Sequence, residues 1–196
     1  MRFRLTLLLL TVLLAACGGN QVRYVDGDPT LSDQVVSRKE LSASQQQVYT
    51  TALAAIESEE YAQAIKLLNS IASSNETLSE VYLNLSLAYY RTDQFEESLA
   101  AAKRAVALDA KSSNTNYMAG LAYLKASQVN AARQAFAAAI EVNPEHAYAH
   151  YNLGLIYDIY YQQLQTAIDH YQRYVILIKE EDQATVEWIE QLKGSL

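Results

Sequence analysis

The sequence predicts an all-α chain, built as a solenoid of about four helix-turn-helix units and closed by a C-terminal helix. Only two prolines and six glycines occur in 196 residues, so long segments are free of helix breakers. A hydrophobic pattern recurs every 34 residues from residue 45 onward, and a final amphipathic segment follows it. A period of this length is typical of stacked helical pairs that form a common core.

The repeated pattern is clearest in residues 82–89 (YLNLSLAY), 118–123 (MAGLAY) and 151–157 (YNLGLIY). These stretches define units 45–78, 79–112, 113–146 and 147–181, the last with one extra residue in its turn. One position in the first helix of each unit and one in the second are small, which predicts close helix contact. The first-helix residues are Ala52, Ser86, Gly120 and Gly154, and the second-helix residues are Ala64, Ser98, Ala132 and Ala167.

The 34-residue period, with Gly and Tyr in the first helix and then Ala, an aromatic residue and Pro, resembles the tetratricopeptide repeat (TPR). The resemblance implies a right-handed α-solenoid that binds protein partners and has no catalytic residues. Residues 182–196 are expected to form a capping helix and tail. The packing face of that helix would carry Ala184, Trp188, Ile189 and Leu192.

The first helices also carry an apolar stripe that, in the TPR family, lines the concave groove. We expect this stripe to be exposed and to bind an extended or helical partner segment. Its members are Tyr49, Leu53, Leu83, Leu87, Tyr90, Tyr117, Leu121, Leu124, Tyr148, Tyr151 and Leu155. Tyr117→Ala with Tyr151→Ala should then abolish partner recovery and leave the melting temperature near wild type. Coverage of the stripe by the N-terminal segment, or homo-oligomer contact, is the alternative.

The N-terminus has the composition of a signal peptide. Arg2 and Arg4 precede twelve uncharged residues, 5–16, which is shorter than the roughly 20 apolar residues of a spanning helix. Leu14-Ala15-Ala16-Cys17 resembles the lipobox of bacterial lipoproteins, and Cys17 is the only cysteine. The resemblance implies that residues 1–16 are removed and that Cys17 carries diacylglyceryl and N-acyl lipid, with no other cofactor.

The residues after Cys17 predict a tether and a location. Residues 17–44 show no hydrophobic period and contain Gly and an Asp-Pro pair, which is typical of a flexible linker. Gly18 stands where lipoproteins retained in the inner membrane commonly have Asp. The resemblance therefore implies an outer-membrane anchor with the repeat array facing the periplasm.

Charge and residue spacing exclude several other functions. The formal net charge of −7 argues against binding to nucleic-acid phosphates, and the loss of Arg2 and Arg4 with the signal would make it more negative. His146 and His150 are four residues apart, but Pro144 precedes them and no cysteine lies nearby, so no metal site is expected. His170 is alone in its helix. No catalytic motif occurs, and an enzymatic function is not expected.

The partner is only weakly indicated. Asn84 and Asn152 match the clamp position with which chaperone-type TPR proteins grip a C-terminal carboxylate, but the lysines of that clamp are missing, so this mode is not expected. Residues 149–193 resemble TPR proteins that accompany TonB–ExbB–ExbD energy-transduction systems. Pilotins of the type IV pilus secretin, adaptors of peptidoglycan hydrolases and subunits for outer-membrane-protein assembly are alternative families of TPR lipoprotein. A self-associating structural lipoprotein is a further alternative.

Overall fold

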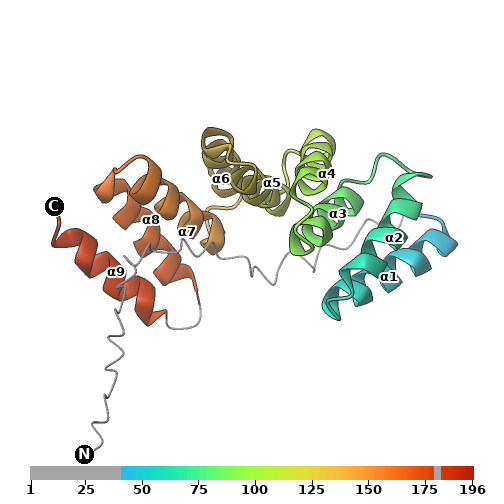
Figure 1. Cartoon of the computed structure of the whole chain (residues 1–196), viewed down its shortest axis with the longest axis horizontal. Helices are drawn as coiled ribbons and strands as arrows, with labels where there is room; N and C mark the ends of the chain where they lie inside the picture. Colours follow the sequence, from blue (N-terminus) through green and yellow to red (C-terminus); the bar gives the residue numbers. More distant parts are fainter. Residues whose placement is uncertain (1–40, 179–181) are drawn as a thin grey trace, which may run out of the picture.

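The computed structural model describes residues 41–178 and 182–196, and every regular element in these ranges is a helix. The predicted signal peptide, Cys17 and the predicted tether up to residue 40 lie outside the described residues. Four helix pairs line up side by side, with α1 and α2 at one end and α9 at the other (Figure 1). The pairs are α1 (Ala43–Glu57) with α2 (Tyr61–Ala72), α3 (Ser79–Arg91) with α4 (Phe95–Leu108), α5 (Ser113–Lys125) with α6 (Val129–Val142), and α7 (Ala147–Leu155) with α8 (Leu164–Leu177).

Each pair packs internally, and its second helix also packs on the first helix of the next pair. A buried apolar cluster runs through α1 to α7, and a second one joins α7, α8 and α9. No pair could bury its apolar face alone, so stacking of neighbours creates the core. The prediction of an all-α solenoid is therefore confirmed.

Every pair turns through a residue with positive φ. These residues are not glycine: Glu59, Asp93, Ser127 and Gln162 have φ between 53° and 60°. In the first three turns, the backbone N–H of the residue after the positive-φ residue donates to the carbonyl five residues earlier. The N–H of Gln94, for example, donates to the carbonyl of Tyr89 at 2.9 Å. A left-handed residue with this bond is the Schellman arrangement that ends many helices.

The fourth unit contains the additional residue, but the structure places it before the turn. The four positive-φ residues are spaced 34, 34 and 35 residues apart. In the fourth turn the N–H of Gln163 donates to Tyr157 at 2.9 Å, six residues earlier instead of five. A π-helical segment, Ile156–Tyr160, continues α7 there. Because a π turn contains one residue more than an α turn, it takes up the insertion within the helix.

Two glycines let aromatic rings of the second helices approach the first helices. A Cβ on Gly120 would lie 2.4 Å from Cε1 of Phe136, and a Cβ on Gly154 would lie 2.7 Å from Cδ1 of Tyr171. Both rings are buried. The small residues expected in the second helices are also fully buried, which confirms the prediction of close contact: Ala64, Ser98, Ala132 and Ala167.

The second unit solves the same contact differently. Ser86 replaces glycine, and Ala102 stands 34 residues before Phe136, where the third unit has its ring. The Oγ of Ser86 donates to the carbonyl of Ser98, and the Oγ of Ser98 donates back to the carbonyl of Ser86, each at 2.9 Å. Removing the ring leaves room for a side chain at Ser86, and each of the two serine hydroxyls donates one buried hydrogen bond.

The first helix begins with a capping box that the sequence analysis missed. The side chain of Ser42 accepts from the N–H of Gln45, whose side chain accepts from the N–H of Ser42. Residues 37–40 (SRKE) have a similar Ser-x-x-Glu pattern, but they lie outside the described residues. A helix that begins at Ala43 overlaps the last residues assigned to the tether.

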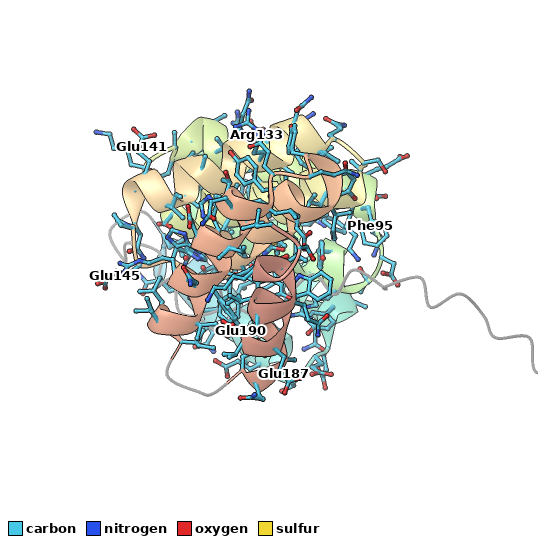
Figure 2. The ribbon with its side chains drawn as sticks, turned by 90° about the vertical axis from the view of Figure 1, so that its left-hand side faces the viewer. Phe95, Arg133, Glu141, Glu145, Glu187 and Glu190 are labelled. Atoms are coloured by element: carbon cyan, nitrogen blue, oxygen red, sulfur yellow. The ribbon has the colours of Figure 1, made fainter. Side chains whose placement is uncertain are left out.

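The capping helix α9 (Gln183–Lys193) covers the end of the last pair with Ile189 and Leu192, which are buried, and Trp188, which is half-buried. Ala184 was expected on this face, but it is exposed, and Thr185 is buried in its place. The hydroxyl and the backbone N–H of Thr185 both donate to the carboxylate of Asp182 at the start of the helix, which holds Thr185 on the inner face. Glu187 and Glu190 lie on the outer side of α9 (Figure 2). A polar outer face is what a terminal element of a solenoid requires.

Candidate protein-interaction surface

Most of the predicted groove residues are buried, which corrects the expectation of an open apolar stripe. Three members, Leu53, Tyr148 and Tyr151, are half-buried. The other eight are at most 8% exposed: Tyr49, Leu83, Leu87, Tyr90, Tyr117, Leu121, Leu124 and Leu155. All eight belong to one or the other of the apolar clusters described above. The ring of Tyr90 also contacts that of Phe95 edge-on. Whether a partner binds along the stripe stays a prediction.

Two buried tyrosines of the stripe link consecutive first helices through asparagine. The Nδ2 of Asn84 donates to the hydroxyl of Tyr49 at 2.9 Å, and the Nδ2 of Asn152 donates to the hydroxyl of Tyr117 at 3.4 Å. Each Nδ2 also donates to the carbonyl four residues earlier, at 2.9 Å. The two pairs are 68 residues apart, so the bond joins the first unit to the second and the third to the fourth. The sequence analysis considered both asparagines for a clamp but did not pair them with tyrosine.

The accessible part of the stripe lies at the two ends of the array. Leu53 is on α1, and Tyr148 and Tyr151 are on α7. The ring of Tyr151 lies 5.7 Å from Tyr171 and 4.9 Å from Tyr174, and Tyr148 lies 6.0 Å from Tyr174. Tyrosines packed against one another in this way offer a rigid aromatic surface whose hydroxyl groups can stay solvated, and little side-chain entropy is lost when a partner binds.

Asp158 joins the fourth pair to the capping helix. One oxygen of its carboxylate accepts from Nε1 of Trp188 at 2.9 Å and from the hydroxyl of Tyr171 at 3.3 Å. Burial of the Tyr171 hydroxyl, and then the negative charge of Asp158 beside it, raise the pKa of Tyr171 well above its ordinary value. The π-helical segment that contains Asp158 therefore fixes the position of α9.

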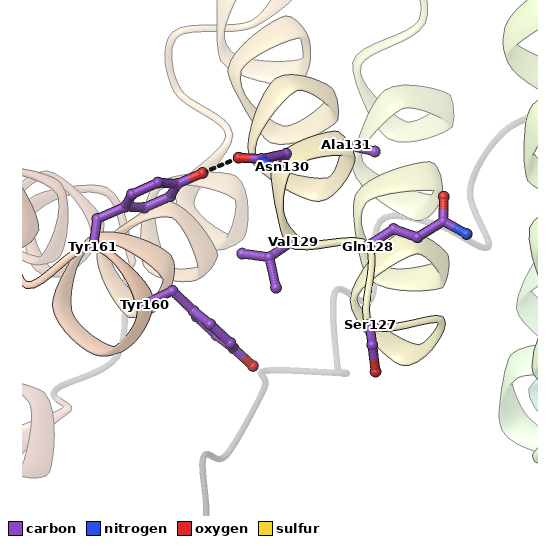
Figure 3. A pocket seen from close by; sticks show the side chains of 7 residues that line it. All are labelled: Ser127, Gln128, Val129, Asn130, Ala131, Tyr160 and Tyr161. Atoms are coloured by element: carbon purple, nitrogen blue, oxygen red, sulfur yellow. Dashed lines mark hydrogen bonds between the residues drawn. The ribbon is translucent and has the colours of Figure 1, made fainter.

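A shallow pocket lies between the α5–α6 turn and the end of the π-helical segment (Figure 3). Tyr160 and Tyr161 form one wall, and the hydroxyl of Tyr161 donates to the side chain of Asn130 (Figure 3). Ser127 and Val129 line the opposite side. The residues that line it include no acid, histidine or lysine.

The structure pairs the histidines differently from the spacing in the sequence. His146 is buried at the start of α7, where its Nδ1 accepts from the N–H of Ala149 and its ring lies 4.6 Å from that of Tyr117. His150 instead meets His170 of α8, with the two Nδ1 atoms 3.1 Å apart. The helix pairing brings together two residues that are 20 positions apart, which spacing alone could not indicate.

We expect the His150–His170 contact to make stability depend on pH. Burial, and then the neighbouring His150, lower the pKa of His170 from 6.5 to about 4, against an opposing effect of Asp169. As pH falls below 6.5 the unfolded chain takes up a proton and the folded chain does not, so stability is lost progressively until about pH 4, by up to about 3 kcal/mol. Burial also lowers the pKa of His150, with Arg173 adding to the effect and the Pro144 carbonyl opposing it.

Denaturant unfolding of wild type and His170→Gln between pH 7 and pH 4 measures this effect. The stability difference between the two proteins should shrink as pH falls, because the variant has no imidazole at this position. A stability difference between the two proteins that stays constant from pH 7 to pH 4 would contradict the expectation. Measuring the difference removes the common contribution of the carboxylates.

Other candidate chemistry is not assembled in the described part of the chain. The carboxylates of Glu59, Glu60, Glu96 and Glu97 are exposed at turns and helix starts. Residues 41–178 and 182–196 contain no cluster of three or more His, Cys, Asp or Glu side chains with metal-binding geometry. In the same ranges no helix combines the length and apolar character needed to cross a bilayer.

Comparison with known proteins shows the same repeat. A family model of the tetratricopeptide repeat matches residues 49–113 and 117–182, together about two thirds of the chain. Each match spans two of the units described above. Anaphase-promoting complex subunit 3 of Schizosaccharomyces pombe is 26% identical over 152 residues, which cover 69% of this chain and 23% of that protein. The chain therefore spans less than a quarter of the curated relative that it matches.

Solved structures show the same architecture at low identity. A crystal structure of MamA covers 79% of this chain and 85% of its own, with 22% identity and a TM-score of 0.67. MamA from Desulfovibrio magneticus RS-1 covers 68% and 75%, with 19% identity and a TM-score of 0.62. A chain in the structure of Naa15/Naa10 bound to HypK covers 78% of this chain and 23% of its own, with 18% identity and a TM-score of 0.59.

Solenoid arrays of this class generally act as non-enzymatic scaffolds that present extended surfaces to other proteins. The helix pairs, the recurring turns and the family match all describe one such solenoid array, and the chain belongs to the tetratricopeptide repeat family.

Proposed function

We propose that this protein is a lipid-anchored TPR scaffold of the bacterial cell envelope that binds a segment of a partner protein. The observation that carries the proposal is the combination, in one chain, of a capped TPR array with a lipobox that ends in the only cysteine. Two or more acyl chains anchor a protein stably, whereas a single chain binds marginally. Anchoring restricts the scaffold to one membrane surface and raises its effective concentration there.

We place the partner segment along the first helices, with contacts at Leu53, Tyr148 and Tyr151. These members of the stripe are half-buried and therefore within reach of a partner. The buried Oδ1 atoms of Asn84 and Asn152 accept no hydrogen bond from the described residues. Both side chains are fully buried, so neither oxygen is within reach of a bound segment in this structure.

Site-specific photo-crosslinking of the full chain in intact cells tests the binding surface. A photoreactive residue at Leu53 or Tyr148 should give a crosslink to a specific envelope protein. The same residue at Glu141, which is exposed on α6, is the matched control and should give none (Figure 2). Equal crosslinking from all three positions would overturn the proposed surface. A product at the mass of two copies of this chain would favour the self-associating alternative.

We expect Cys17→Ser to release the protein from the membrane. Without the thiol no diacylglyceryl group can be attached, so the variant lacks the two acyl chains of that group. Its membrane binding then falls to that of the unmodified chain. Fractionation of cells followed by immunoblotting measures the shift from the membrane to the soluble fraction. Cys17→Ser protein that remains in the membrane fraction would contradict the proposed lipid anchor.

The pathway is proposed from the C-terminal half. Residues 149–193 resemble TPR proteins of TonB–ExbB–ExbD systems, and we propose an outer-membrane, periplasm-facing role in such a system. A secretin partner would instead indicate a pilotin, and a peptidoglycan hydrolase would indicate an adaptor. The mass-spectrometric identity of the crosslinked protein decides among these three.

A further inference from the structure

His150 on α7 and His170 on α8 form a contact that the proposed scaffold function does not use. Their Nδ1 atoms are 3.1 Å apart, and their ring centroids are 5.3 Å apart. Both side chains are half-buried. The contact therefore lies at the edge of the fourth helix pair, where the rings are held by the protein but solvent can reach them.

The protonation pattern of the pair follows from its partners. The second nitrogen of His150, Nε2, lies 3.2 Å from the carbonyl of Pro144. A carbonyl only accepts, so Nε2 carries the proton, and in the neutral ring the Nδ1 of His150 has a free lone pair. The Nδ1 of His170 then donates to it. A backbone carbonyl on the distal nitrogen is the arrangement by which proteins orient a histidine toward a metal.

We propose that His150 and His170 bind one divalent transition-metal ion of the Zn²⁺, Ni²⁺ or Cu²⁺ class through their Nδ1 atoms. Two nitrogens bound to Zn²⁺ at about 2.0–2.1 Å and a tetrahedral angle stand about 3.3 Å apart. The observed 3.1 Å separation is close to this value, and binding requires each ring to turn until its Nδ1 faces the ion. The proton on Nδ1 of His170 moves to its Nε2, so no proton is released and no redox change occurs.

The surroundings favour neutral, fixed ligands. The ring of Tyr157 is nearly parallel to that of His170, with an interplanar angle of 4°, which limits rotation of the imidazole. Burial lowers the pKa of both histidines, which favours the neutral imidazoles that metal binding requires. Asp169 adds a negative charge near His170, and Arg173 adds a positive one near His150. The described residues supply two ligands, and water completes the coordination.

Calorimetric titration of the full chain with Zn²⁺ or Ni²⁺ alone tests the site. The sample for this titration is prepared without a histidine tag, which would itself bind the metal. It carries Cys17→Ser, so that the lone thiol cannot bind the metal either. We expect one ion per chain, and an affinity at least about tenfold lower in His150→Gln and in His170→Gln, because each loses one of two ligands. His146→Asn is the matched control: it removes the third histidine, keeps a good helix N-cap, and should bind as wild type.

Two further measurements keep the test independent of variant folding. In the wild-type protein, metal addition should shift the ring NMR signals of His150 and His170 and leave those of His146 in place. Zn²⁺ should also raise the melting temperature, because it binds the folded chain. Unchanged affinity in both glutamine variants, or shifts confined to other side chains, would show adventitious binding and overturn the proposal.

Discussion

Gly120→Ala is expected to lower the free energy of unfolding by about 1–3 kcal/mol, even though alanine is the better helix former. The new Cβ would lie 2.4 Å from Cε1 of Phe136, and the ring is fully buried and cannot move into solvent. Either the ring shifts against its neighbours or α5 and α6 move apart. The gain in helix propensity, about 1 kcal/mol, does not offset this overlap. Denaturant unfolding measures the loss.

Gly194→Ala is the matched control for this prediction. Gly194 follows α9 with φ of −69°, and a Cβ there would have its nearest neighbour, the carbonyl of Gln191, at 3.5 Å. The same substitution should therefore change stability by only a few tenths of a kcal/mol. Gly120→Ala with Phe136→Ala should cost less than the two single variants added together, because the second change removes the overlap. Wild-type stability of Gly120→Ala would refute the close contact.

Tyr117→Ala is expected to have the larger effect, about 3–5 kcal/mol, as for other buried aromatic residues that are cut back to alanine. Tyr117 is fully buried, its ring lies 5.6 Å from Phe136 and 4.6 Å from His146, and its hydroxyl accepts from Asn152. The change would leave a cavity among three elements of the third and fourth units. Thermal unfolding followed by circular dichroism measures the loss.

Tyr117→Phe separates the ring from the hydroxyl. It keeps the ring packing and removes the hydrogen bond from Asn152, so it should cost only about 1 kcal/mol. Because Tyr117 is fully buried, we no longer expect the double variant Tyr117→Ala with Tyr151→Ala to melt near wild type, so it is a poor test of partner binding. If Tyr117→Ala melted like Tyr117→Phe, the ring would not contribute to the core as the structure indicates.

The sequence predicted the fold well because a repeat reports each contact several times. The small side chains at Gly120 and Gly154, and at their counterparts in the second helices, indicated close helix packing from residue size alone. The extra residue of the fourth unit was counted correctly. Its place in a π-helical segment could not be predicted, because a longer turn and a longer helix have the same sequence length.

The candidate surface was predicted less well. Hydrophobic periodicity shows that Tyr49, Leu83 and Tyr117 share a face, but it does not show what that face contacts. The structure buries all three between neighbouring units and leaves Tyr148 and Tyr151 half-buried near the capping helix. Exposure depends on every element that packs nearby, so it is a property of the assembled array.

By itself the sequence determined the 34-residue unit and the helical class, because each of these is a pattern of residue types, and it shows one cysteine after Leu14-Ala15-Ala16. Only the tertiary structure decided which stripe residues are buried, that Asp158 binds Trp188, and that His150 meets His170 and not His146. Those contacts join residues 20 or more positions apart. Their formation depends on how helices stack, which no local pattern contains.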